Sequence, residues 1–391
     1  MIPYCQHDVR AEDREAVAKV LDSSRLTQGP VGREFEAALA GRLGAGYAAA
    51  VSSGTSALQI ALQAMHLREG DEVLVPSLTF LATANAVLLA GGRPVFVDVE
   101  PETLSMSPVD FARRMTPRTR GAVLVHYAGH AADPEMFREV LGSERFLIED
   151  ACHALGATRA GAAIGATSEA ACFSFHPAKH ITTGEGGAIV TNSSRLAVRF
   201  QSLREHGMER DARRRVGLGL PAELASEQTG GWVYEMHALS GNHRLSDLGA
   251  ALGLSQLARL GENLDARRRI AERYEGAFAD EDWVETLRVP SGTRSAWHLF
   301  PVLLDVDRID GGRAEIYRAL HEAGIGVQVH YIPIHLQPFY RELASTRYGD
   351  LPNTESTYLR LLSLPLFPEL SASAQDHVID ALRSTVVSRL K

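Results

Sequence analysis

The sequence has little cysteine, no excess of basic residues and no long apolar run. Its three cysteines, Cys5, Cys152 and Cys172, are scattered and odd in number, so neither a disulfide framework nor a metal-ligand spacing is indicated. The 40 basic residues are outnumbered by 48 acidic ones, and a net charge of −8 disfavours a general binder of nucleic acid or of anionic membranes. No apolar run is long enough to cross a bilayer, and the start of the chain lacks the apolar core of a signal peptide. We therefore expect a cytoplasmic protein.

Internal repeats and low-complexity tracts are also missing, and the chain has the composition of an ordinary globular protein. It has 391 residues, of which 45% are hydrophobic, and this length favours roughly two domains with substantial cores. We predict a large domain with an N-terminal arm over residues 1–245. A connector helix and a smaller C-terminal α+β domain are predicted over residues 246–391.

Short apolar segments alternate with helical ones between about residue 33 and residue 202. The segments predicted as strands are AAAVSS, DEVLVP, RPVFVDV, GAVLVHY, RFLIED, AACFSF and GAIVT. Strands that are apolar throughout indicate a sheet covered on both faces, and the intervening helices favour largely parallel order. Ligands bind such sheets at the carboxyl ends of the strands. The sequence therefore predicts an α/β domain whose site lies at that edge.

The pattern changes beyond residue 240. The stretch from Asn242 to Phe278 reads as one long helical pattern with Leu245, Leu248 and Leu252 on one face. Further on, HLFPVLLDV and GIGVQVHYIP are predicted strands, and GRAEIYRALHEAG and SASAQDHVIDALRSTVVSRL are predicted helices. The segment Gly217 to Gly231 is predicted to be a flexible insert, either a lid or a plain surface loop.

A single lysine stands in SFHPAKHITTGEGG, between the predicted strands AACFSF and GAIVT. A buried ammonium is costly unless it is paired or used covalently, and such a lysine loses its proton readily. Lys179 is therefore either a surface-loop lysine that reaches solvent or a nucleophile that forms a Schiff base with an aldehyde.

Three further sequence motifs carry residues that fit the same cofactor as Lys179. Asp150 ends a strand in IEDACHALGA, where it either holds a protonated pyridine nitrogen or caps a helix. Gly54 and Thr55 in SSGTSAL stand at a strand-to-helix turn, which either binds a phosphate through free N–H groups or is simple capping. Phe80 in SLTFLAT is either a core residue or a ring that stacks on a flat heterocycle. Together with Lys179, in this order on an α/β scaffold, they indicate pyridoxal phosphate.

These segments resemble the DegT-type sugar aminotransferases, a family of fold-type I pyridoxal phosphate enzymes. The resemblance runs from LTQGPVGREFE near the start to LSLPLFPEL near the end, and its landmarks include SSGTSAL, HYAGHAAD, IEDACHALGA, SFHPAKHITTGEGGAIVTN, GNHRLSDLGAALGLSQL and VQVHYIPIHLQPFY. It implies a largely parallel seven-stranded sheet between helices, with a smaller C-terminal domain. It also implies pyridoxal 5'-phosphate as cofactor and a homodimer with shared active sites.

The resemblance implies a role for each matched residue. Lys179 would carry the cofactor and shuttle a proton, and Asp150 would pair with the pyridine nitrogen. The other cofactor contacts would be Gly54, Thr55 and Ser174 at the phosphate, Phe80 on the ring, His153 at the ring hydroxyl, and Asn242 at the phosphate of the neighbouring subunit. The substrate candidates are Arg244, His330 and Tyr331. His153 stands where the family often has glutamine.

The resemblance also limits the reactions and substrates to be considered. A dehydratase branch of the family carries histidine at the position of Lys179, so transamination is favoured. The motifs are most similar to members that move an amino group from L-glutamate to C4 of a UDP-linked 4-keto-6-deoxy-N-acetylhexosamine in pseudaminic acid biosynthesis. One alternative is another nucleotide-sugar aminotransferase, of perosamine or bacillosamine type. A second alternative is a non-catalytic cofactor-binding regulator. A third is a plain nucleotide-binding module, but the sequence lacks the G-x-G-x-x-G fingerprint of such a module, and Lys179 would have no role in it.

Overall fold

The computed structural model describes residues 1–165 and 168–391. At its centre is a seven-stranded sheet in the order β1-β9-β8-β5-β4-β2-β3. In that order the strands are β1 (Tyr47–Val51), β9 (Gly187–Thr191), β8 (Ala170–Ser174), β5 (Phe146–Asp150), β4 (Thr119–Val125), β2 (Glu72–Pro76) and β3 (Arg93–Val97). The pairs from β8 to β3 are parallel, and β9 runs antiparallel to β1 and β8. The seven predicted segments each supply one strand, and the largely parallel α/β sheet is confirmed.

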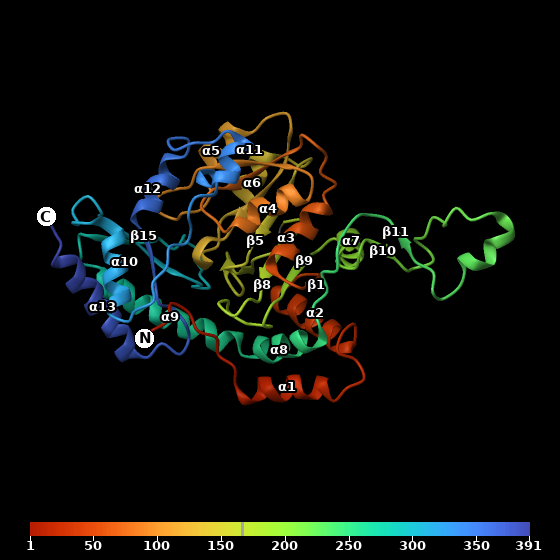
Figure 1. The fold of residues 1–391 in the computed structure, drawn as a ribbon, viewed down its shortest axis with the longest axis horizontal. Helices are drawn as coiled ribbons and strands as arrows, with labels where there is room; N and C mark the ends of the chain where they lie inside the picture. Colours follow the sequence, from red (N-terminus) through yellow and green to blue (C-terminus); the bar gives the residue numbers. More distant parts are fainter. Residues whose placement is uncertain (166–167) are drawn as a thin grey trace.

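Helices cover both faces of this sheet (Figure 1). One face packs against α3 (Gly54–Gln63), α4 (Leu81–Leu89) and α7 (Ser194–Arg204). The other packs against α2 (Pro30–Leu43), α5 (Pro108–Arg114), α6 (Pro134–Leu141) and α8 (Asp247–Ala258), with α1 (Ala11–Leu21) outside α8. Because neighbouring residues of a strand point to opposite faces, Leu147 and Ile148 of β5 enter different cores. Burial on both faces explains why these strands are apolar throughout.

The C-terminal part has its own core around a three-stranded antiparallel sheet. Its elements are α9 (Leu260–Phe278), β12 (Val284–Thr286), β14 (Phe300–Leu304), α10 (Gly312–Glu322), β15 (Leu361–Leu364) and α13 (Ala372–Val387). The predicted helices here are confirmed as α10 and α13, and HLFPVLLDV contains β14. The strand predicted over GIGVQVHYIP is wrong. That segment makes isolated bridges, Ile325 with Ile2 and Gln328 with Ser363, so its backbone groups pair with two separate partners instead of one continuous neighbour.

The predicted long helix is interrupted at Arg259, which separates α8 from α9. Ala250 and Leu257 of α8 pack in the core of the large sheet, whereas α9 from Ile270 onward packs in the C-terminal core. The predicted domain boundary at residues 245 and 246 stays a prediction. The remaining short elements are η1 (Tyr127–Gly129), β6 (Thr158–Arg159), β7 (Ala162–Ala163), β13 (Thr293–Arg294), η3 (Ile334–Leu336), α11 (Pro338–Ala344) and α12 (Pro352–Arg360).

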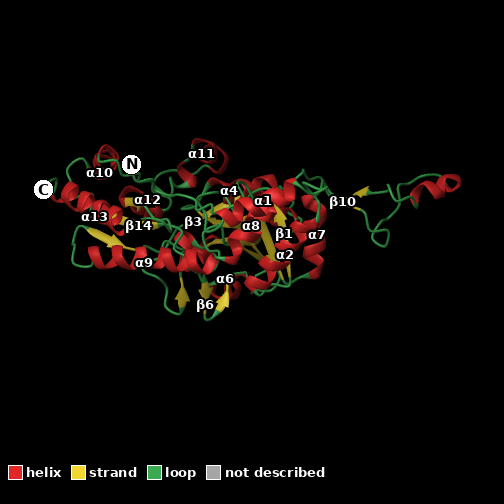
Figure 2. Ribbon diagram, turned by 90° about the horizontal axis from the view of Figure 1, so that it is seen from below, coloured by secondary structure: helices red, strands yellow, loops and turns green. Residues whose placement is uncertain are grey.

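A long arm projects away from the body of the molecule (Figures 1 and 2). It starts and ends with the paired strands β10 (Met208–Glu209) and β11 (Glu235–Met236) and carries η2 (Ala222–Gln228). The insert predicted at Gly217 to Gly231 lies on this arm. Its base is held by the Glu235 carboxylate, which accepts hydrogen bonds from the N–H groups of Val216 and Gly217, both at 2.7 Å.

Among the helices of the described residues, none has both the length and the apolar character needed to cross a membrane.

Candidate active site

A cavity of about 390 Å³ opens at the edge of the large sheet that the sequence singled out. Asp150 is the last residue of β5 and Ser174 is the last residue of β8, so both lie at carboxyl ends of strands. The predicted cofactor residues that line the cavity are Gly54, Thr55, Phe80, Asp150, His153, Ser174 and Lys179. The fold thus brings together residues that are spread over more than a hundred positions of the sequence.

Lys179 lies in the loop between β8 and β9, partly buried and on the cavity wall. The loop is closed by hydrogen bonds from Phe175 N–H to the Gly186 carbonyl, at 2.8 Å, and from Thr183 N–H to the Phe175 carbonyl, at 3.0 Å. Burial lowers the pKa of Lys179 from its ordinary value, although Cys152 and Asp150 act in the opposite direction. The structure therefore favours the nucleophile over the surface-loop lysine.

The Asp150 carboxylate is buried and held by two donors. Its Oδ2 accepts a hydrogen bond from Thr83 Oγ1 at 2.8 Å, and its Oδ1 accepts one from the Cys152 N–H at 3.2 Å. These contacts fix the direction of the carboxylate at the cavity wall. The chain after Asp150 forms turns and not a helix, so the helix-cap alternative is wrong.

The N-terminus of α3 meets the same cavity. Ser53 caps this helix, because its Oγ accepts a hydrogen bond from the Ser56 N–H at 3.0 Å. Helical bonding leaves the first N–H groups of a helix without an internal partner, and here these belong to Gly54 and Thr55. A Cβ atom at Gly54 would lie 2.9 Å from the Ser174 Cβ and 3.1 Å from the Cys152 Sγ. Capping and a cradle for an anion are therefore both present.

Aromatic and imidazole rings form another part of the wall. Tyr331 Oη lies 2.9 Å from His153 Nε2, and the ring centroids of Phe80 and Tyr331 are 5.8 Å apart. The Phe80 side chain is 54% exposed, so its assignment to the core is wrong. Burial lowers the pKa of His153 well below its usual value and lowers that of His330 to about 4, and Lys179 adds to both shifts. Both imidazoles are therefore neutral near pH 7.

Comparison with known proteins identifies the family and the fold. Residues 7–383 match the DegT/DnrJ/EryC1/StrS aminotransferase family. The chain belongs to this family. It is 37% identical over 387 residues to the spore coat polysaccharide biosynthesis protein SpsC of Bacillus subtilis, and the match covers 98% of this chain and 97% of SpsC.

Two solved structures extend the comparison. PseC of Helicobacter pylori, an aminotransferase involved in the biosynthesis of pseudoaminic acid, is 30% identical with a TM-score of 0.89, and 99% of each chain is covered. The PLP-form of Spr1654 from Streptococcus pneumoniae is 26% identical with a TM-score of 0.89, and 100% of each chain is covered. The DegT family and its solved members are sugar aminotransferases that depend on pyridoxal phosphate. This chain is therefore a transferase of that class, with the fold-type I architecture and pyridoxal phosphate as its cofactor. The non-catalytic alternatives are wrong.

The residues around the cavity fit this DegT-family cofactor. Gly54 leaves space at a helix N-terminus, where a phosphate is favoured. Asp150 supplies an oriented carboxylate for a ring nitrogen, and Lys179 supplies an amine. In addition, the buried Nδ1 atom of His153 has no hydrogen-bond partner within the described part of the chain, so it is available to a bound hydroxyl.

Gly54→Ala is expected to weaken cofactor retention about tenfold, because the new methyl group would push the helix N-terminus away from Ser174 and Cys152. Fluorescence or absorbance titration of the apoenzyme with cofactor measures this loss. Gly41→Ala is the matched control, since a Cβ atom at Gly41 meets nothing within 4 Å. Equal affinities for the two variants would contradict the assignment of Gly54 to the phosphate.

Two predicted residues do not reach the cavity of their own chain. Asn242 pairs with Glu205 in an isolated β-bridge, and the Arg244 guanidinium lies 3.2 Å from the Glu205 carboxylate. Both stand in the loop just before α8. The resemblance gave Asn242 a role in the neighbouring subunit, and that role stays a prediction. The substrate role of Arg244 also stays a prediction.

Several cavity residues were not found from the sequence. Tyr4 comes from the N-terminal segment, and its ring centroid is 5.5 Å from that of His330. His298 lies between β13 and β14. Cys152 and Glu185 lie within the motifs of Asp150 and Lys179, but neither was singled out as a cavity residue. No periodic pattern marks Tyr4 or His298, because each is a single side chain from a distant part of the sequence.

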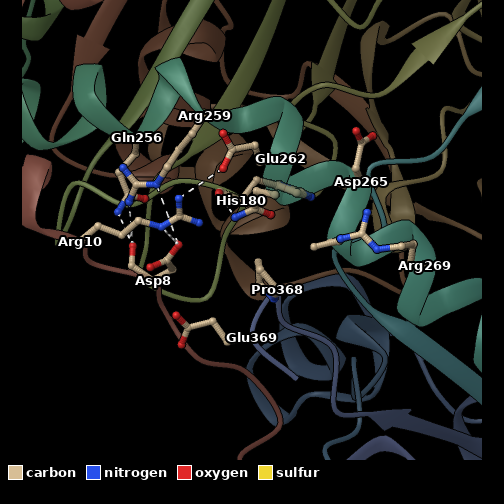
Figure 3. A pocket seen from close by; sticks show the side chains of 12 residues that line it. Asp8, Arg10, His180, Gln256, Arg259, Glu262, Asp265, Arg269, Pro368 and Glu369 are labelled. Carbon is tan, nitrogen blue, oxygen red and sulfur yellow. Dashed lines mark hydrogen bonds and ion pairs between the residues drawn. The ribbon is translucent and has the colours of Figure 1, made fainter. Parts of the chain in front are cut away.

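His180 follows Lys179 in the chain but faces a different cavity. Its Nε2–H donates to the Ala296 carbonyl at 3.0 Å. It lines a polar cavity of about 440 Å³ (Figure 3). There Arg10 lies 2.8 Å from Asp8 and 3.2 Å from Glu262, so its charge is already neutralised. Hence Lys179 reaches the catalytic cavity and His180 does not, as expected for an aminotransferase.

Proposed function

We propose that this chain transfers an amino group from L-glutamate to C4 of a UDP-linked 4-keto-6-deoxy-N-acetylhexosamine, the amination of pseudaminic acid biosynthesis. The observation that carries the reaction class is the placement of Lys179, Asp150 and the N-terminus of α3 around one cavity. The choice of sugar is supported by the motif resemblance and by the similarity to PseC over 99% of the chain.

The lysine has the properties that amino transfer requires. A neutral amine acts in turn as nucleophile and as base, and burial lowers the pKa of Lys179 toward the range where the neutral form is populated. When bound, the cofactor supplies an electron sink for the carbanion at the donor Cα. Asp150 offers its negative charge to the ring nitrogen, and Thr83 keeps that carboxylate in place. Lys179 would act as the base that removes the proton from the donor Cα and as the acid that delivers it to C4′ of the cofactor.

Part of the cavity is built from uncharged groups, and these include two candidate substrate residues. His330 and Tyr331 lie on its wall, and burial raises the pKa of Tyr331 well above its usual value. The His330 Nδ1 is 2.9 Å from Ser363 Oγ, which orients the ring. Neutral hydrogen-bonding groups of this kind suit the hydroxyl and N-acetyl groups of a sugar. His330 and Tyr331 are therefore proposed to contact the sugar or the amino donor.

Incubation with L-glutamate and the UDP-4-keto sugar, followed by NMR of the product, tests this function. We expect an amine at C4 and 2-oxoglutarate in equal amount. A panel of UDP-, dTDP- and GDP-linked keto sugars, with UDP sugars of more than one ring configuration, separates the alternative, a nucleotide-sugar aminotransferase of perosamine or bacillosamine type. We keep that alternative because the chain is also 37% identical to a protein of spore coat polysaccharide biosynthesis. Turnover of a dTDP or GDP substrate without turnover of the UDP substrate would contradict the proposal.

We further propose that the active unit is a homodimer with shared sites. The arm supports this, because its side chains Val216, Trp232 and Tyr234 are 86%, 68% and 51% exposed in the isolated chain. An isolated pair of strands as short as β10 and β11 is at most marginally stable in water. Large apolar side chains exposed together on such an arm are typical of a surface that another chain covers. The exposed position of Asn242 also fits a contact with a second copy.

Mixing Lys179→Ala with Asn242→Ala is expected to restore about a quarter to a half of the activity, because each mixed dimer of two-fold symmetry holds one intact site. A quarter follows from free exchange of subunits, and a half follows if mixed dimers alone form. The control mixes Lys179→Ala with Lys179→Arg, where neither site has the lysine. The proposal of shared sites fails if the first mixture recovers no more activity than the control.

A further inference from the structure

Lys179 has a close neighbour with no assigned role. The Nε2 atom of His298 lies 3.2 Å from Lys179 Nζ, and its ring centroid is 4.3 Å from that of His153. The His298 side chain is 5% exposed and lines the same cavity. Burial, with a smaller contribution from the charge of Lys179, lowers the pKa of His298 well below its usual value. The ring is therefore neutral near pH 7 and offers a nitrogen lone pair to an ammonium.

The position of His298 is set independently of Lys179. Its backbone N–H donates to the Ala128 carbonyl at 2.9 Å, in the turn η1. From the other side, the buried Arg267 guanidinium donates to the carbonyls of Trp297 and His298 at 3.3 and 3.4 Å. Two separate elements, η1 and α9, therefore hold the backbone that carries this ring.

We propose that His298 is a positioning residue for Lys179, whose amine it holds toward the catalytic cavity through a hydrogen bond at Nε2. A lysine amine ends a flexible four-carbon stem, so without a partner it would sample several directions. A neutral acceptor restricts the amine without adding a second charge beside it. This inference rests on the proposed role of Lys179 as nucleophile and base.

Burial and other titratable groups near Lys179 also affect the pKa of its amine. Burial is the largest effect on the pKa of Lys179 and lowers it, while Cys152 and Asp150 raise it. The remaining charged or titratable groups that interact with Lys179 are Cys5, His153, His180, Arg267 and His330. The His298 substitutions leave all of these groups in place.

The test uses the apoenzyme, and it is simplified because the chain has just three lysines, Lys19, Lys179 and Lys391. Pulse acetylation with isotopically labelled acetic anhydride across a pH series, read by peptide mass spectrometry, gives a titration midpoint for each amine. His298→Leu removes the acceptor and destabilises the ammonium form. The Lys179 midpoint is therefore expected to fall by about one to two pH units, the size of one hydrogen bond to a charged group. His298→Gln keeps an acceptor and is expected to restore the wild-type midpoint.

His180→Gln is the matched control. His180 is a buried histidine that follows Lys179, burial lowers its pKa so that the ring is neutral near pH 7, and its hydrogen bond goes to the Ala296 carbonyl and not to the Lys179 amine. The Lys179 midpoint of His180→Gln is expected to match the wild type, as are the midpoints of Lys19 and Lys391 in each variant. An unchanged Lys179 midpoint in His298→Leu overturns the inference, and so does an equal shift in His180→Gln. His298→Met also removes the imidazole acceptor and is expected to lower the Lys179 midpoint by the same amount. It therefore replaces His298→Leu if that variant does not fold.

A separate experiment distinguishes failure of this inference from failure of the proposed function. Borohydride reduction of the cofactor-loaded wild type, followed by peptide mapping, locates the attached lysine. A label away from Lys179 together with the shifted midpoint would reject the proposed function and keep the hydrogen bond to His298. A label on Lys179 together with an unshifted midpoint would keep the proposed function and reject the hydrogen bond to His298.

Discussion

Lys179→Ala is expected to lower kcat/KM by about a thousandfold or more, which is the scale of a lost acid–base group in an enzyme site. The variant loses both the amine that attaches the cofactor and the base at the donor Cα. Steady-state kinetics with glutamate and the keto sugar measure the rate. The visible absorption of lysine-attached cofactor is expected to disappear as well, which a spectrum of the reconstituted protein checks.

Two comparisons make this result specific. Lys179→Arg keeps a positive charge, but a guanidinium does not deprotonate in proteins and so supplies neither nucleophile nor base. It is expected to be as inactive as the alanine variant. Lys19→Ala is the control, because Lys19 is an exposed residue of α1 whose partner is Glu15. If Lys179→Arg retained both turnover and the absorption band, the covalent role of Lys179 would be refuted.

Asp150→Asn is expected to lower kcat by about a hundred- to a thousandfold, the scale of one preorganised charged contact in a buried site. The substitution preserves the shape of the side chain and removes the charge that the ring nitrogen needs. Cofactor affinity is expected to fall with it. Kinetics at saturating glutamate and an absorbance titration with cofactor measure the two effects separately.

Thr83→Val separates the charge of Asp150 from its orientation. It removes the hydrogen bond at 2.8 Å to Asp150 Oδ2 and leaves the carboxylate in place. We expect a fall of about tenfold, in line with the loss of one hydrogen bond to a charged group. Equal activities of Asp150→Asn and the wild type would exclude the charge pair, whatever the Thr83 variant shows.

The prediction from sequence was strongest where one local pattern decides the structure. Apolar runs of four to seven residues with turns between them predicted the seven strands, because a strand buried on both faces must be apolar throughout. The same logic placed Asp150 and Lys179 at the correct edge of the sheet. It was wrong for GIGVQVHYIP, which has the composition of a strand but has no continuous neighbouring strand to pair with.

The sequence by itself therefore determined the α/β class and the positions of the seven strands along the chain, and it predicted the cofactor residues that stand beside them. The order of the strands in the sheet came from the tertiary structure. Tertiary structure alone decided that Tyr4, His298 and Tyr331 meet at Lys179. The physical reason is that periodicity and turn chemistry act over a few residues, whereas each of these side chains is more than a hundred positions away from Lys179 in the sequence. Their meeting depends on how two hydrophobic cores pack against one edge of a sheet, and no local pattern encodes that packing.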